Sequence, residues 1–266
     1  MDTGKTKKEP FYQELDRRLL DKGSVLQLID RDLLKFIALV LMTLGHWSWD
    51  IYKYFIPSKP LLRFFVAAEY FAPPVFFFFI AEGFHYTRSR TRYALRLLIL
   101  AVITQAPNSL TSPGGFTLRT LFLQWSVLMT LFLGLAALIV VHSEWRLTLR
   151  LLTVAALMGL SWLLNCEWKV SGIMIILLFD LLRDKPLERL AGYMILMLAV
   201  ISVTVGGLPD TDVFLRFLLP VWSAGAVITF FYNGKKGHFP LFSKYFFYVW
   251  YPLHLLVQWL FRITMA

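Results

Sequence analysis

The chain has 266 residues, of which 58% are hydrophobic and only 17% are charged. A soluble domain usually has about a quarter of its residues charged, and the mean hydropathy of +0.61 lies on the apolar side. Apolar runs such as 33–51 and 118–141 reach the roughly 20 residues that a helix needs to cross a bilayer. This composition excludes a soluble enzyme, a disordered chain and a disulfide scaffold. It predicts an all-α fold, a polytopic membrane helical bundle.

The net charge of +10 gathers in short segments between the apolar runs. Such segments are typical of cytoplasmic loops in membrane proteins, so we expect membrane lipid, and no nucleic acid, as a partner. The single Cys166 has no second cysteine with which to form a disulfide or a metal site. No metal is therefore expected.

The chain begins with a basic tail, 1–10, followed by an amphipathic segment, 11–29, that predicts a helix on the membrane surface, broken near Gly23. Residues 1–30 are thus expected to form a cytoplasmic tail and interfacial helix, and residues 31–266 a transmembrane domain. The first apolar run begins at Leu33, is too long for a signal peptide and lacks a small-residue cleavage site. We expect it to remain as an uncleaved anchor.

The hydropathy pattern predicts nine membrane spans, at 33–51, 62–84, 94–108, 118–141, 148–165, 168–182, 190–206, 214–232 and 245–263. Because 94–108 and 168–182 are short, eight spans or a re-entrant segment stay open. Pro73 and Pro74 predict a kink in the second span, since neither can donate a backbone hydrogen bond.

With nine spans, 20 of the 27 Lys and Arg residues fall on the side of the N-terminus. Positive charge favours the cytoplasmic side. The count therefore predicts a cytoplasmic N-terminus, an outside C-terminus and a multi-pass protein of the inner (plasma) membrane.

Ionisable residues inside membrane spans are costly and are therefore functional candidates. In the first span Lys35 and His46 are eleven residues apart, which puts them on one helix face and about 16 Å apart along the axis. Asp50 follows one turn later and is expected to accept a hydrogen bond from the His46 ring, as a general base requires. The alternative is an interfacial histidine beside an aromatic belt of Trp47 and Trp49.

The second span carries Glu82 and His85 near its end, and Arg88 or Arg96 is the expected partner of the carboxylate. The alternative is a structural ion pair that locks two helices. In the last span Tyr251 and His254 share one face with Gln258, and this face is expected to line a cavity or to make a helix-packing hydrogen bond.

Two charged positions, Glu167 and Asp180, are interpreted as boundary charges of the sixth span. The segment YNGKKGHF (232–239) places two glycines around Lys235 and Lys236, and such a loop can offer backbone N–H groups and ammonium groups to a phosphate. With the neighbouring arginines it predicts a basic cytoplasmic face suited to a nucleotide such as coenzyme A.

Three stretches together resemble the TraX family of pilin acetylases: LLKFIALVLMTLGH (33–46), FAPPVFFFFIAEGFHYTRSRTRYALRLLI (71–99) and YNGKKGHFPLFSKYFFYVWYPLHLL (232–256). The last is the most specific. The spacing from Lys35 to His46 also resembles the signature of the wider acyltransferase-3 superfamily, a basic residue followed by histidine eleven positions later.

The resemblance implies acyl transfer, with acetyl-CoA as donor and an amine or hydroxyl as acceptor. His46 is then the base and Lys35 a donor-side residue. A second family motif contributes Glu82, His85, Arg88, Tyr93 and Arg96, and a third contributes Tyr248, Pro252 and His254. One departure stands out, because the family usually has an acidic residue where this chain has Gly45.

The resulting hypothesis puts the phosphates of acetyl-CoA on Arg88, Arg90, Arg92, Arg96, Lys235, Lys236 and Lys244, with the pantetheine arm beside Lys35. His46 and Asp50 would activate the acceptor, His254 and Tyr251 would stabilise the oxyanion, and Glu82, His85, Tyr93 and Tyr248 would line the substrate pocket. The acceptor stays open between a protein N-terminus, a glycan and a small molecule. The alternatives are an envelope-polysaccharide O-acetyltransferase, a transporter or flippase, and a structural membrane component.

Overall fold

The computed structural model describes residues 11–20, 27–237 and 240–265, with the backbone alone at 11, 12 and 240–244. Its regular elements are helices, and the described residues make one isolated parallel bridge, between Ile29 and Tyr232. The predictions for 1–10 and for the break near Gly23 lie outside the described residues.

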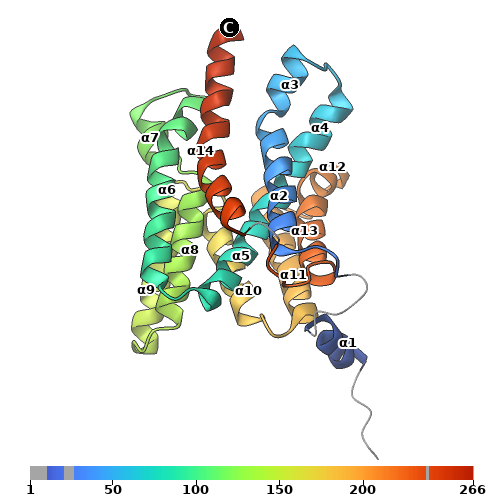
Figure 1. Cartoon of the computed structure of the whole chain (residues 1–266), viewed down its shortest axis with the longest axis vertical. Coiled ribbons are helices and arrows are strands. Elements are labelled where there is room, and N and C mark those ends of the chain that lie inside the picture. Colours follow the sequence, from blue (N-terminus) through green and yellow to red (C-terminus); the bar gives the residue numbers. More distant parts are fainter. Residues whose placement is uncertain (1–10, 21–26, 238–239, 266) are drawn as a thin grey trace, which may run out of the picture.

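Figure 1 shows the helices as a bundle. They are α1 (Phe11–Leu20), α2 (Arg31–His46), α3 (Ser48–Tyr54), α4 (Lys59–Ala68), η1 (Glu69–Phe71), α5 (Ala72–Tyr86), α6 (Arg90–Thr111), α7 (Leu118–Leu123), α8 (Val127–Val141), α9 (Leu147–Leu163), α10 (Lys169–Leu181), α11 (Pro186–Val205), α12 (Thr211–Val213), η2 (Phe214–Leu218), α13 (Leu219–Phe230) and α14 (Pro240–Met265).

Five helical stretches are long and apolar enough to cross a membrane: Lys59–Tyr86, Arg90–Thr111, Leu118–Val141, Pro186–Val205 and Thr211–Phe230. The stretch Leu118–Val141 comprises α7 and α8, which the non-helical residues 124–126 separate. Leucines on α9 and valines on α11 are largely exposed, as lipid-facing positions require. The expected short span 94–108 belongs to the 22-residue helix α6. The predicted all-helical membrane fold is therefore confirmed, while the count of nine spans and the orientation of the ends stay predictions.

Helix α5 lies in the middle of the bundle and contacts α2, α8, α10 and α13 (Figure 1). Its phenylalanines Phe77, Phe78 and Phe79 are buried, together with Ile80 and Phe84. A helix that is apolar on all sides belongs in the interior of a large bundle. The Phe run that marks the second predicted span thus forms the core on which the other helices pack.

The predicted kink in the second span lies just before the two prolines. A proline ring clashes with the carbonyl four residues earlier, and for Pro73 and Pro74 these are the carbonyls of Glu69 and Tyr70. The chain adopts the 3₁₀ turn η1 there, and α5 then starts with both prolines in its first turn, where no backbone N–H is needed.

The helix ends meet in two groups, which we call the basic end and the opposite end. At the basic end, Arg31 N donates to Lys235 O at 3.0 Å, and the His85 ring lies 2.5 Å from Asp180. At the opposite end, Arg262 contacts Asp50. Figure 1 shows α1 at one end of the bundle and the C-terminus at the other.

The tight packing of α10 against α5 and α8 gives a first prediction. A Cβ atom on Gly172 would lie 2.5 Å from Thr130 Cγ2 and 3.0 Å from Phe77 Cζ, whereas one on Gly159 in α9 would meet nothing within 4 Å. Gly172→Ala is expected to lower the free energy of unfolding by about 1–3 kcal/mol through overpacking. Gly159→Ala, the control, should keep or raise the melting temperature in detergent, because Ala is the better helix former. Equal melting temperatures for the two variants would contradict this packing.

Candidate active site

Two histidines from distant helices meet inside the bundle. Nδ1 of His46, the last residue of α2, lies 3.1 Å from Nε2 of His254 in α14, although the two residues are 208 positions apart. His254 is 2% exposed and His46 is half-buried. The structure thus joins two residues that the sequence analysis assigned to one catalytic site.

A backbone carbonyl determines how hydrogens are distributed over this imidazole pair. Nδ1 of His254 lies 3.1 Å from Trp250 O, and a carbonyl only accepts, so this nitrogen carries the hydrogen of the neutral ring. Nε2 of His254 is then an acceptor, and Nδ1 of His46 donates to it. His46 Nε2 therefore keeps its lone pair, which is the state that a general base needs.

The expected hydrogen bond between Asp50 and the His46 ring is not formed. Helix α2 ends at His46 and α3 begins two residues later, so the helical register that would align Asp50 with His46 is interrupted at Trp47. Asp50 instead accepts from Gln258 Nε2 at 2.7 Å and from Arg262 Nε at 3.0 Å. Gln258 also donates to the His46 carbonyl at 2.6 Å. Asp50 therefore influences the imidazole pair through the position of α14.

An acidic side chain nevertheless lies beside the end of α2. A Cβ atom on Gly45 would overlap the Glu69 side chain, including its carboxyl group. Gly45 thus leaves the room that Glu69, from η1, occupies. The family's acidic residue is missing from α2, and a carboxyl group from the neighbouring helix stands next to that position.

A cavity of about 280 Å³ lies between α2, α5, α6, α8 and α14. Its wall includes Lys35, whose Nζ is 4.7 Å from the centroid of the Phe79 ring, and the predicted pocket residues Tyr93 and Tyr248. Tyr251 also lines it, and its ring centroid is 5.4 Å from that of His254. The cavity thus connects the predicted donor side with the neighbourhood of the imidazole pair, which lies just beyond its lining.

The predicted phosphate-binding cations lie at the basic end and are exposed: Arg88, Arg90, Arg92, Arg96, Lys235 and Lys236. The Lys244 side chain lies outside the described residues. Arg90 stacks over Phe84, with its guanidinium carbon 4.0 Å from the ring centroid. The exposed charges are therefore accessible to an anion from solution.

The glycine loop before α14 is arranged differently from the predicted phosphate cradle. Lys235 N donates to Asn233 Oδ1 at 2.8 Å, so this amide is already used. Gly237 packs against Asp32, since a Cβ atom there would overlap the carboxyl group. The loop thus offers its lysine ammonium groups, but its glycines serve packing and turn geometry, with Gly234 at φ +67°.

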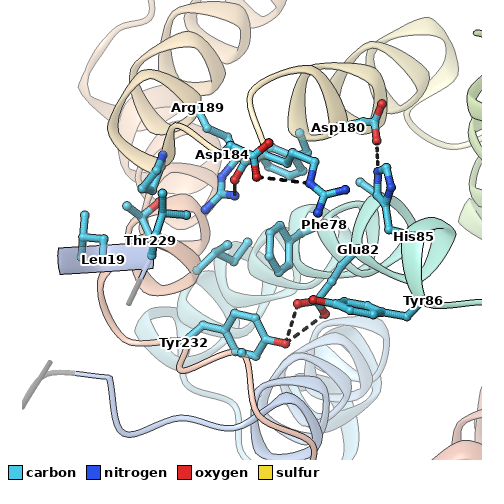
Figure 2. A pocket seen from close by; sticks show the side chains of 17 residues that line it. Leu19, Phe78, Glu82, His85, Tyr86, Asp180, Asp184, Arg189, Thr229 and Tyr232 are labelled. Carbon is cyan, nitrogen blue, oxygen red and sulfur yellow. Dashed lines mark hydrogen bonds and ion pairs between the residues drawn. The ribbon is translucent and has the colours of Figure 1, made fainter. Parts of the chain in front are cut away.

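Glu82 has a partner that the sequence did not predict, the Tyr232 phenol, which donates to it at 2.9 Å (Figure 2). Burial, and then the Glu82 carboxylate beside it, raise the pKa of Tyr232 well above its usual value. The phenol therefore stays protonated and keeps donating. Sequence analysis expected Arg88 or Arg96 in this place.

His85 belongs to a second histidine group, at the basic end. Its Nε2 lies 2.5 Å from Asp180 Oδ1, and His142 Nε2 lies 2.7 Å from Asp180 Oδ2. The sequence analysis interpreted Asp180 as a boundary charge and did not single out His142. The sequence held one signal for this cluster. Successive spans cross the membrane in opposite directions, so the ends of 62–84, 118–141 and 168–182 lie on the same side.

Together these features define an all-helical membrane protein with an imidazole pair between α2 and α14 and a cavity whose wall includes the neighbouring Tyr251. The family described as TraX protein matches residues 30–262. The chain therefore belongs to the TraX family, as the resemblance in three of its stretches implied.

The chain is also similar to a probable fimbrial assembly protein, FimC of serogroup H1, from Dichelobacter nodosus. The two are 29% identical over 233 residues, which cover 84% of this chain and 91% of the relative. No solved structure matches this chain.

The anchoring of α14 by Asp50 gives a second prediction. Asp50→Asn removes the charge that Arg262 and Gln258 hold, and it is expected to lower the free energy of unfolding by about 1–3 kcal/mol. The loss of unfolding free energy is expected to be smaller than for a fully buried ion pair, because the Arg262 side chain is 37% exposed. Asp212, which is 57% exposed and 2.9 Å from Arg216, provides the matched control. Asp212→Asn should change the stability by less than about 0.5 kcal/mol. Similar thermal shifts in detergent for both variants would refute the anchoring role.

Proposed function

We propose that this protein is a membrane acyltransferase of the acyltransferase-3 type, which moves an acetyl group from acetyl-CoA to an acceptor used in fimbrial or pilus assembly. The observation that carries the proposal is the imidazole pair of His46 and His254, in which His46 Nε2 keeps its lone pair, together with a cavity whose lining includes Tyr251, the neighbour of His254. The similarity to a fimbrial assembly protein supports the biological setting.

The imidazole pair provides the proton chemistry of the transfer. His46 Nε2 takes a proton from the acceptor amine or hydroxyl as its nitrogen or oxygen attacks the thioester carbonyl. A C–N or C–O bond forms and the C–S bond breaks. The departing thiolate then takes the proton from His46 and leaves as free coenzyme A. His254, which accepts from His46 Nδ1, stabilises the charged ring during this step.

The developing oxyanion needs a donor that is not already used. The single hydrogen of His254 is directed at Trp250 O, so the expected role of His254 as oxyanion donor is unfavourable. The Tyr251 hydroxyl group belongs to a side chain that lines the cavity, and it supplies the donor in this proposal.

The cavity and the exposed cations define the donor side. Coenzyme A carries several phosphate charges, and these charges favour the arginines and lysines of the basic end. The cavity is lined mainly by aliphatic and aromatic side chains, with Arg31, Asp32 and Lys35 toward the basic end, so it suits the pantetheine arm. The axial distance of about 16 Å from Lys35 to His46 is comparable with the length of that arm.

The acceptor approaches from the opposite end. An open depression there is lined by Trp49, Asp50, Tyr52, Lys53, Tyr54 and Arg262. A protein N-terminus is the first candidate acceptor, because it agrees with a role in fimbrial assembly. The three aromatic rings also suit a sugar, which keeps an envelope glycan as the second candidate acceptor.

The third prediction tests the base. His46→Ala is expected to reduce transfer of labelled acetyl groups from acetyl-CoA by about 10²–10⁴-fold, the usual contribution of a general base. The protein should still insert into the membrane and keep its melting temperature within a few degrees. The acetylated product, identified by mass spectrometry, distinguishes a protein N-terminus from a glycan.

Asp50→Asn is the informative comparison for His46→Ala. It should retain most of the transfer activity at a temperature where it stays folded, because Asp50 does not contact the ring. Near wild-type turnover by His46→Ala would end the proposal. Equal losses in the two variants would mean that Asp50, and not His254, is the partner of the base.

The fourth prediction tests the donor side. The double variant Lys235→Glu/Lys236→Glu is expected to raise the KM for acetyl-CoA by about tenfold or more, since like charges repel the phosphates. The control Lys59→Glu/Arg63→Glu reverses two exposed charges of α4 at the opposite end and should leave this KM unchanged. An equal KM for both double variants would remove the glycine loop from the donor site.

A further inference from the structure

The polar cluster at the basic end brings three potential metal ligands from three different helices together. His85 lies in the last turn of α5, His142 directly follows α8, and Asp180 lies in the last turn of α10. Their two Nε2 atoms and the carboxylate oxygen lie within 4.8 Å of one another. Neither the imidazole pair nor the cavity beside Lys35 uses these residues.

We propose that His85, His142 and Asp180 bind one divalent transition-metal ion, with Zn²⁺ as the reference case. Two imidazoles and one carboxylate form a donor set that zinc uses in proteins. A tetrahedral ion with bonds of about 2.0–2.1 Å holds its ligand atoms about 3.3 Å apart. The short distances to Asp180, 2.5 and 2.7 Å, would open slightly and the two Nε2 atoms would approach each other.

The converging helix ends and one carboxylate favour a cation at this point, while Arg183 and Arg189 line the adjoining cavity. The C-terminal end of a helix carries a partial negative charge, and the ends of α5, α8 and α10 converge here around a carboxylate that is 9% exposed. Within the described residues, the ion pairs of Asp180 are with the two histidines alone. A divalent ion would neutralise this charge while using the lone pairs of both rings.

An open coordination position is available beside the cluster. A cavity of about 200 Å³ is lined by His85 and Asp180 and also by Glu82, Tyr86 and Asp184 (Figure 2). It has room for a water molecule or an oxygen of a ligand as the fourth donor. Imidazole nitrogen distinguishes the site from one for Mg²⁺ or Ca²⁺, which prefer oxygen ligands only.

Metal binding by the full-length protein in detergent tests this proposal. After treatment with EDTA and dialysis against Zn²⁺, the wild-type protein is expected to retain one zinc ion per chain in elemental analysis. Zn²⁺ should raise its melting temperature, whereas Mg²⁺ should not. Bound Co²⁺ should show the visible absorption bands of a four-coordinate ion.

Variants identify the ligands. His142→Gln and Asp180→Asn should each weaken Zn²⁺ binding by at least about 100-fold and remove the thermal shift. His254→Gln and Asp212→Asn, which make the same changes elsewhere, should retain both properties.

Three results would overturn the proposal: less than one tenth of a zinc ion per wild-type chain, equal binding by all four variants, or an equal thermal shift with Mg²⁺. The first and third need only the wild-type protein, so they decide the question even when a ligand variant fails to fold. A cluster that is held together by hydrogen bonds alone would give the first result.

Discussion

The packing of the helices depends on hydrogen-bond partners for the polar side chains that α14 carries into the bundle. His254, Gln258 and Arg262 follow one another at intervals of four residues and therefore form one stripe on the helix. In an apolar surrounding each unpaired group would cost several kcal/mol, and their partners lie on α2, α3 and the end of α6. One register between α14 and α2 satisfies all three, and this register also brings the two imidazoles together.

The interruption of the first span at Trp47 changes which residue assists His46. In a continuous helix Asp50 would stand one turn beyond the ring. Because the helix breaks, the carboxylate turns toward Gln258 and Arg262, and the ring turns toward His254. Helical spacing thus singled out His46 and Asp50, but the hydrogen bond predicted between them is not formed, and each has another partner. A similar exchange occurs at Gly45. Helix α2 has no side chain there, and the Glu69 side chain from η1 fills the space.

The sequence predicted the all-helical membrane fold and the irregular backbone before Pro73 because these follow from hydropathy and backbone chemistry. It could not predict partners such as Tyr232 for Glu82, which depend on how helices 150 positions apart pack together. Asp180 looked like a boundary charge because a single span shows only its own termini. Alternating spans put the ends of α5, α8 and α10 on one side, but only the assembled bundle shows that they converge and make Asp180 the centre of a cluster.

In the proposed transfer the cavity has to hold the arm of coenzyme A and also to open toward His46. Pro252 helps to meet both requirements. In the proposed reaction, coenzyme A would be held by its charges at the basic end, and only its flexible arm would reach His46. The cavity ends at Tyr251, one helical turn short of the imidazole pair along α14. Pro252 has no backbone N–H to donate to the carbonyl of Tyr248, which also lines the cavity. Helix α14 therefore lacks one backbone hydrogen bond at that level.

Bending is easiest where a helix has lost such a hydrogen bond. A small bend of α14 at Pro252 would move the Tyr251 side chain and open a path from the cavity to His46. The hydrogen bonds of Gln258 and Arg262 would hold the outer half of the helix in place.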